Sequence, residues 1–431
     1  MSELGGSIKS AIGEQRPAPF AVPTLGRRLK AWLCERGPEV VVMGSTLEIS
    51  ATYIPFMHGK YLVDGRTLSV IDAGEVSMVI FVVFGFFVLS RKGVRSLGRL
   101  GAGVLIFLMY AVVVTALQRP VLGAMDLFRL VLLGAFAVGS MALRSGHASS
   151  ELLGRCFRRL ILWAVGLSIV AILQIMVGFH LWNSDLGQRS NATLADPNHL
   201  ARFLVVAIAL LPAARIRHVW LTFLILASGV ASTGSRAGVL ILGVVAVFGY
   251  MTTSGKSRRL YVGMLIGSAL MVAFYVERFF RLVANLGAGS AGRTVLIEEG
   301  FKSWLRSPVV GCGTGCFPEA LSEEAGVALD RFHEGLRASH TSVVTILVEL
   351  GAVGLFLVGI FLLRPGASKT IRNMYPGLAA AGLVIFLGSL MEGRLLQDMT
   401  FWYLLSLAVA VSATDRKQQC TSGKSRKGLV T

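Results

Sequence analysis

The chain has 431 residues, of which 54% are hydrophobic and 15% charged, and its formal net charge is +18. Soluble domains carry about 25% charged residues, so this composition excludes an ordinary soluble enzyme and indicates a membrane protein. Lys and Arg in cytoplasmic loops explain the positive charge, and no aromatic–basic surface of the kind that binds nucleic acid accompanies them, so we expect no nucleic-acid partner.

Apolar segments recur along most of the chain. A membrane-spanning helix needs about 20 mostly apolar residues, and twelve segments meet or approach this length, the first being the weakest because it contains Glu48. The sequence therefore predicts an all-α, polytopic membrane helical bundle of about twelve transmembrane helices. The segments are 39–57, 71–90, 101–118, 124–143, 157–179, 199–213, 218–232, 237–252, 260–276, 341–363, 375–391 and 399–413.

The distribution of Lys and Arg gives the bundle a direction. If the N-terminus is cytoplasmic, every inner connection is basic, whereas the short outer connections hold one or two basic residues each. Both termini are then cytoplasmic. We expect a cytoplasmic arm (1–37), spans one to nine (38–276), an outer loop (277–340), spans ten to twelve (341–413) and a basic tail (414–431).

The long outer loop between spans nine and ten is expected to be functional, because compact proteins rarely keep such loops otherwise. Residues 292–305 have the apolar spacing of an amphipathic helix lying on a membrane surface. The following "SPVVGCGTGCF" is a Pro/Gly turn region. Cys312 and Cys316 could pair if the loop lies outside the cytoplasm, but we favour two small residues in a glycine-rich turn. Because no His or Asp stands beside them, no metal site is expected.

Arg236, in "STGSRAG", is a single charge between two apolar runs, at the predicted outer start of span eight. Basic residues are scarce on that side, and the positive end of a helix dipole disfavours a cation. A bound anion would offset both costs, because helix N–H groups and a guanidinium together make a phosphate site. Gly234 and Gly238 are expected to let the anion approach the backbone. Pairing with a lipid headgroup or a loop carboxylate is the alternative.

Two other spans begin on the outer side with polar and basic residues. His340 precedes span ten, where nearby hydroxyls can cap the helix and the dipole favours a neutral imidazole; simple capping or packing is the alternative. Glu349 lies nine residues later, about 180° around the helix, and is expected to form hydrogen bonds within the bundle. Span six begins with Pro197 after Asp196 as the cap. The candidate site residues are Arg236, Arg293, His340, Asn198, His199 and Arg202.

The segments "TGSRAG", "GRTVLIEEGFKSWLRSPVVGCGTGCF" and "SHTSVVTILVELGAVGLFL" together resemble the O-antigen ligase and polymerase superfamily of bacterial envelopes. The shared pattern is a Ser-Arg-Gly-like turn before a span, an Arg-initiated helix, a Pro–x–x–Gly–x–Gly segment and a His heading a span with Glu-x-Gly. The resemblance covers about residues 190–365, and the chain departs from it at Ala237 and at the two loop cysteines.

The resemblance implies an enzyme of the bacterial inner membrane whose active site faces the periplasm. Its donor would be a glycan on undecaprenyl diphosphate, with no cofactor and no metal. Arg236 and Arg293 would hold the diphosphate, and His340 would assist the acceptor hydroxyl. From their position at the outer start of span six, and not from the resemblance, we expect Asn198, His199 and Arg202 to bind substrate as well.

The residue chemistry agrees with this activity. A glycosyl diphosphate already carries a good leaving group, so an enzyme needs cations for the departing charge and a base for the hydroxyl. Two arginines and a neutral histidine meet these needs, which favours a single inverting displacement. A covalent route would need a carboxylate nucleophile, for which Glu298 and Glu299 are the weak candidates near Arg293.

Three other functions are weighed against O-antigen ligation to lipid A–core. A polymerase of the same superfamily would use a growing glycan as acceptor. A secondary transporter suits twelve spans, but it should show an internal repeat and interrupted spans at the midplane, and the two halves of this chain do not resemble each other. A non-catalytic scaffold would give no reason for paired arginines at helix starts.

Overall fold

The computed structural model describes the greater part of ten of the twelve predicted spans and of the amphipathic segment. Predicted span one, most of span two, the N-terminal arm and the basic tail lie outside the described residues. The described residues are 60–63, 66–69, 79, 82–83, 98–118, 124–144, 150–178, 190, 192, 197–274, 286–317, 341–366, 376–391, 395–398 and 400–408.

Spans three to twelve are helical where predicted, with ends shifted by a few residues, and residues 400–408 form the last described helix. The helices are α3 (Gly98–Gln118), α4 (Ala124–Arg144), α5 (Ser150–Val177), α6 (Pro197–Ala214), α7 (Val219–Ser232), α8 (Arg236–Thr252), α9 (Lys256–Phe274), α11 (Leu286–Arg306), α13 (Ser342–Gly366), α15 (Pro376–Met391) and the short 3₁₀ helix η5 (Leu395–Gln397).

A small β-hairpin was not predicted. Strands β1 (Lys60–Val63) and β2 (Arg66–Ser69) pair antiparallel, with Lys60 opposite Ser69 and Val63 opposite Arg66. The hairpin falls in the outer connection between predicted spans one and two, where the sequence "KYLVDGRTLS" carries an Asp-Gly turn signal at its centre. Elsewhere in the described part of the chain, the regular structure is helical, as expected.

Four of the described helices are long and apolar enough to cross a membrane: α3, α5, α6 and α13. Helices α7, α8 and α15 are apolar but shorter. These helices indicate a multi-pass membrane protein. Twelve spans and the orientation of the bundle remain predictions from the sequence.

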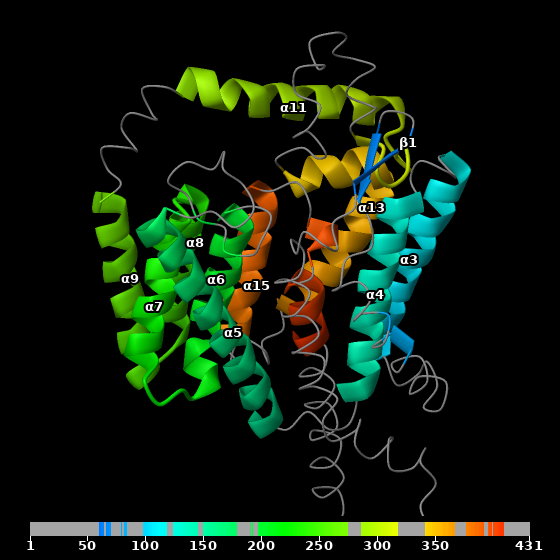
Figure 1. Cartoon of the computed structure of the whole chain (residues 1–431). Helices are drawn as coiled ribbons and strands as arrows, with labels where there is room; N and C mark the ends of the chain where they lie inside the picture. Colours follow the sequence, from blue (N-terminus) through cyan, green and yellow to red (C-terminus); the bar gives the residue numbers. More distant parts are fainter. Residues whose placement is uncertain are drawn as a thin grey trace, which may run out of the picture.

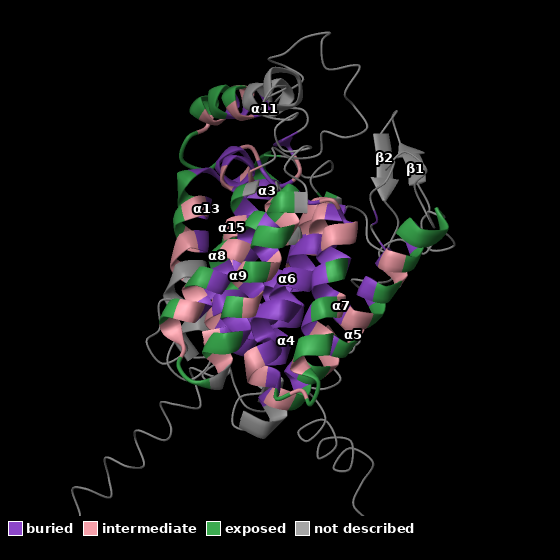
Figure 2. Ribbon diagram, turned by 90° about the vertical axis from the view of Figure 1, so that its left-hand side faces the viewer, coloured by how far each residue is buried: buried purple, intermediate pink, exposed green. Residues whose placement is uncertain are grey.

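Helix α6 forms the centre of one group of helices and packs against α5, α7, α8 and α15. Its residues are apolar on every side, and Leu204 and Ile208 are fully buried, as expected for a helix surrounded by others. Figure 2 shows α6 as a mainly buried element, whereas α5 and α7 carry exposed bands on their outer faces. A second group contains α3, α4 and α13, and α13 also packs on α15.

Helix α11 lies across one end of the bundle (Figure 1). Helices α6, α8 and α13 all begin at this end, because the chain runs up and down through consecutive helices. The predicted amphipathic helix at 292–305 is therefore confirmed, and it extends six residues further toward the N-terminus.

Candidate functional site

The first component of the candidate site is the tight turn between α7 and α8. Gly234 adopts φ 59°, a left-handed conformation that glycine tolerates best. Ser235 is the N-cap of α8, and its side chain accepts a hydrogen bond from the Gly238 backbone N–H at 3.2 Å. Arg236 is then the first residue of the helix and is exposed. The turn thus holds the Arg236 side chain at the rim of the α11 end.

The second component is the start of α6, which packs directly against α8. Helix α6 begins at Pro197, as predicted, and Asn198 and His199 are half-buried. A Cβ added at Gly238 would lie 2.7 Å from the Ala201 Cβ. The expectation that Gly238 lets an anion approach the backbone is wrong, because α6 covers this glycine.

Arg202, the residue that follows Ala201 in α6, forms a buried ion pair. Its Nη2 lies 2.7 Å from Oδ2 of Asp398, and the two side chains are 6% and 9% exposed. The other carboxylate oxygen, Oδ1, accepts a hydrogen bond from the Thr400 backbone N–H at 2.8 Å. The Arg202 side chain packs against Gly388 of α15. A Cβ added at Gly388 would lie 2.5 Å from Cδ of Arg202. In the structure, Arg202 therefore pairs with a carboxylate of the protein itself.

The third component is the start of α13, two residues beyond His340. The Ser342 Oγ accepts a hydrogen bond from the Leu395 backbone N–H at 3.0 Å, which fixes the helix start to η5 and thus beside Asp398. Thr341 Oγ1 accepts a longer bond from the Val344 N–H at 3.4 Å, so one of the predicted cap hydroxyls does cap the helix. His340 itself lies outside the described residues.

Helix α13 is interrupted at Gly351, which adopts φ 66° and ψ −171°. Carbonyl groups just before the break accept hydrogen bonds from outside the helix: Val348 O from Cys312 N–H at 2.9 Å, Glu349 O from Gly313 N–H at 2.8 Å. Tyr110 of α3 donates to Leu350 O at 2.8 Å. After the break, Ala352 N–H donates to Pro308 O at 2.9 Å. From the sequence, span ten was predicted as one continuous helix, and this interruption was not predicted.

The segment that satisfies both broken ends is the turn region at 308–316. Cys312 and Cys316 form a disulfide within it, with Cα atoms 6.0 Å apart. The favoured interpretation of two unpaired small residues is therefore wrong, and the alternative is correct. Thr115 of α3 shares a 3.0 Å hydrogen bond with the Thr314 hydroxyl and accepts another from the Thr314 N–H at 3.1 Å.

Helix α11 packs onto the first half of α13 through a small separate core. Gly300 permits this contact, because a Cβ there would lie 2.6 Å from Val344 Cγ1. Arg293 lies on the same helix, two turns before Gly300, and its side chain lies outside the described part of the structure. The core consists of Leu296, Cys316, Phe317, Val344 and Val348, with Ile297, Trp304 and Cys312 at its edge.

Both candidate carboxylate nucleophiles on α11 contact one lysine. Lys302 Nζ lies 2.8 Å from Glu299 Oε1 and 3.2 Å from Glu298 Oε1. The hydrogen bond to Glu299, followed by that to Glu298, raises the pKa of Lys302 above its ordinary value. Both carboxylates are thus engaged in ion pairs within α11.

A further loop borders the α7–α8 turn. Gln174, near the end of α5, accepts a hydrogen bond from Ala192 N–H at 2.9 Å and donates to Ala192 O at 3.0 Å. Ser190 N–H donates to Ser232 O at 3.1 Å, so this loop joins α5 to the end of α7. Ala192 has φ 48°, and the two Gln174 bonds hold this uncommon conformation in place.

The structure therefore brings three predicted helix starts together: α8 contacts α6 at Gly238, and α6 contacts the η5 segment through Arg202 and Asp398. Ser342 joins that segment to α13. Asp398 was missed from the sequence; an acid beside apolar helices is a functional candidate by default, and this signal could have found it. Within the described chain, no group of three or more His, Cys, Asp or Glu side chains could hold a metal ion.

Comparison with known proteins gives one family match. Residues 221–359 match the family model described as O-antigen ligase, a segment that contains Arg236, Arg293 and His340. No match to this chain is found among curated proteins.

Proposed function

We propose that the protein is a glycosyltransferase acting at the periplasmic face of the bacterial inner membrane, because residues 221–359 match the family model described as O-antigen ligase. It transfers a glycan from undecaprenyl diphosphate to an acceptor hydroxyl, and the acceptor is lipid A–core. The donor brings its own leaving group, and in this proposal arginine cations, in place of a metal ion, stabilise the charge on that group, with no cofactor.

In this proposal, Arg236 and Arg293 hold the diphosphate. Arg236 stands at the first position of α8, and in this proposal the positive end of the helix dipole and the guanidinium bind one anion. Arg293 precedes Gly300 by two helical turns on α11, about 10 Å along the helix axis, and Gly300 rests on α13. As the glycosidic bond breaks, negative charge grows on the diphosphate, and two fixed cations stabilise that charge without reorganisation.

His340 is the proposed general base. It lies two residues before Ser342, which begins α13 and bonds this helix start to η5. The positive end of the helix dipole favours the neutral form of the His340 imidazole. The imidazole removes the proton of the acceptor hydroxyl as the oxygen attacks the anomeric carbon. The bond from that carbon to the diphosphate oxygen breaks, undecaprenyl diphosphate leaves, and the configuration inverts. Asn198 and His199, half-buried at the start of α6, are proposed to contact the glycan.

The observation that carries the proposal is the convergence of the starts of α6, α8 and α13 beneath α11 (Figure 1). In this proposal, each start contributes one of the polar residues expected for this chemistry: His199, Arg236 and His340. Arg202 has a structural role at this end of the bundle, because its ion pair with Asp398 fixes α6 to the η5 segment. We propose that it positions the substrate-binding residues beside it.

The interruption of α13 does not favour a transporter. Discontinuous helices in transporters use their unwound backbone groups to coordinate substrates and ions. In this chain, the carbonyls of Val348, Glu349 and Leu350 and the N–H of Ala352 are bonded to the 308–313 segment or to Tyr110. The break therefore serves to dock that segment.

The direct test uses the purified full-length protein in lipid vesicles with an undecaprenyl-diphosphate-linked glycan and lipid A–core. We expect glycosylated lipid A–core in the presence of a chelator. A product that elongates the lipid-linked glycan instead would identify a polymerase, and a requirement for magnesium would contradict the metal-free mechanism. In cells, deletion of a ligase leaves lipid-linked polymer and no long-chain lipopolysaccharide, whereas deletion of a polymerase leaves single-repeat bands.

A further inference from the structure

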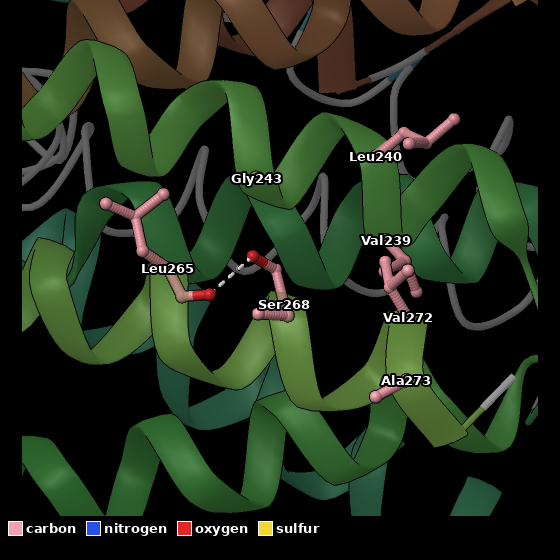
Figure 3. Close-up of a pocket in the computed structure, with 8 residues that line it drawn as sticks. Val239, Leu240, Gly243, Leu265, Ser268, Val272 and Ala273 are labelled. Carbon is pink, nitrogen blue, oxygen red and sulfur yellow. Dashed lines mark hydrogen bonds between the residues drawn. The ribbon is translucent and has the colours of Figure 1, made fainter. Parts of the chain in front are cut away.

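An apolar groove lies between α8 and α9 (Figure 3). Its volume is about 440 Å³, within the range of roughly 300–1,000 Å³ for sites that bury a small ligand. The groove opens outward, because Leu240 and Val272 on its two walls are 50% and 41% exposed. The lining residues are Val239, Leu240, Gly243, Leu265, Ser268, Ala269, Val272 and Ala273.

The groove begins one helical turn from Arg236. Leu240 and Gly243 follow Arg236 by four and seven residues, so all three lie on one stripe of α8. The rise of the helix puts Gly243 about 10 Å from Arg236 along the axis. An extended molecule with a phosphate at Arg236 can therefore continue directly into the groove.

The chemistry of the lining matches a hydrocarbon chain. Ser268 carries the one hydroxyl group among the lining residues, and it donates a hydrogen bond to Leu265 O at 2.9 Å (Figure 3). The hydroxyl is thus satisfied within α9. Small residues at positions 243, 268, 269 and 273 leave recesses between the larger Leu and Val side chains.

We propose that this groove binds the isoprenoid chain of the donor lipid, with the first isoprene units below Arg236. The recesses at the small residues accommodate the methyl branches that distinguish an isoprenoid from a straight acyl chain. The inference rests on the proposed function for the identity of the lipid. It adds a specificity site that recognises the lipid portion of the donor and not its sugar.

A labelling experiment tests the groove independently of transfer. The full-length protein in nanodiscs is irradiated with undecaprenyl diphosphate, lacking any glycan, that carries a diazirine near the diphosphate. We expect the label on peptides that contain residues 239–243 and 265–273, and at least a tenfold loss of labelling with excess unmodified undecaprenyl diphosphate. Labelling elsewhere, or equal competition by phosphatidylglycerol, would overturn the proposal.

Paired variants then test whether the groove selects the donor. Ala269 lines the groove, whereas its neighbour Leu270 does not and is 65% exposed. Ala269→Trp should raise KM for the undecaprenyl-linked donor about tenfold and leave KM unchanged for a donor whose diphosphate carries a methyl group in place of the prenyl chain; Leu270→Trp should change neither. Equal effects of the two variants, or equal effects on both donors, would refute the groove assignment. Absence of transfer by the wild type with every donor would instead refute the enzymatic function, and the labelling would still decide the groove.

Discussion

Arg202 and Asp398 are separated by almost two hundred residues in the sequence, yet they form a 2.7 Å ion pair at the end of the bundle beneath α11. Asp398 also accepts the Thr400 N–H, so the carboxylate joins α6 to the chain that enters the last described helix. Ser342 fixes α13 to the same η5 segment. One buried pair thus determines how three parts of the candidate site lie relative to each other.

Removal of either partner should be strongly destabilising. Arg202→Ala or Asp398→Ala leaves an uncompensated buried charge, for which we expect a loss of about 3–5 kcal/mol. The double variant Arg202→Met/Asp398→Leu should recover most of that loss, because an apolar pair of similar volume is often neutral. Thermal unfolding of the detergent-solubilised protein measures all three. Additive losses in the double variant would mean that the two side chains are not coupled.

Arg236 should matter for transfer and not for folding, because its side chain is exposed. Arg236→Ala removes one cation from the proposed diphosphate site, and we expect kcat to fall about 10²–10³-fold with unchanged expression and melting temperature. Arg236→Lys should recover only part of the activity, since a point charge lacks the bidentate fork. Initial rates on the undecaprenyl-linked donor provide the measurement, and full activity in Arg236→Ala would exclude the diphosphate clamp.

His340 should contribute to the rate more than to donor binding. His340→Ala removes the proposed base, and we expect kcat to fall about 10²–10⁴-fold while KM for the donor changes little. Wild-type activity should decline as the pH falls, because a protonated imidazole cannot accept the hydroxyl proton. A matching decline in His340→Ala, or a loss confined to KM, would assign the histidine another role.

The helices and their positions were predictable because they depend on local apolar composition and length, which the sequence shows directly. The start of α6 at Pro197 and the amphipathic character of α11 have the same origin. Arg236 was singled out as a candidate because a cation at a helix start is locally unfavourable, and its position at the start of α8 is confirmed. These features need no knowledge of which helices touch.

The missed features depend on contacts between distant segments. Gly238 looked like a place for an anion, but it is where α8 touches Ala201 of α6. The pairing of Arg202 with Asp398 requires knowing that η5 lies beside α6. The break at Gly351 depends on a loop that begins more than forty residues earlier and bonds to both sides of it. A Gly within an apolar run gave no local sign of this.

Gly351 should not tolerate a side chain. At φ 66° and ψ −171°, the backbone is in a region open essentially to glycine, with a cost of about 1–3 kcal/mol for other residues. A Cβ would also meet the Val309 carbonyl oxygen. We expect Gly351→Ala to lower the melting temperature and the transfer rate together, since the turn region at 308–316 would be displaced.

Gly359 in the same helix is the matched control. A Cβ there meets nothing within 4 Å, and Ala is favoured over Gly within a helix by about 0.5–1 kcal/mol. Gly359→Ala should therefore be neutral or slightly stabilising in the same thermal unfolding assay. If both variants behaved alike, the interruption at Gly351 would have no special role in the folded protein.

The Cys312–Cys316 disulfide should stabilise the turn that docks on the break in α13. Chain entropy for so short a loop predicts about 2 kcal/mol, so Cys312→Ser/Cys316→Ser should unfold at a lower temperature than the wild type. Dithiothreitol should lower the melting temperature of the wild type to that of the double variant and leave the double variant unchanged. Alkylation followed by mass spectrometry identifies the bond, because only a reduced protein exposes both thiols to the reagent. If both cysteines were alkylated without reductant, the disulfide would be absent, and the turn would be held by Thr115 and by its backbone hydrogen bonds to α13.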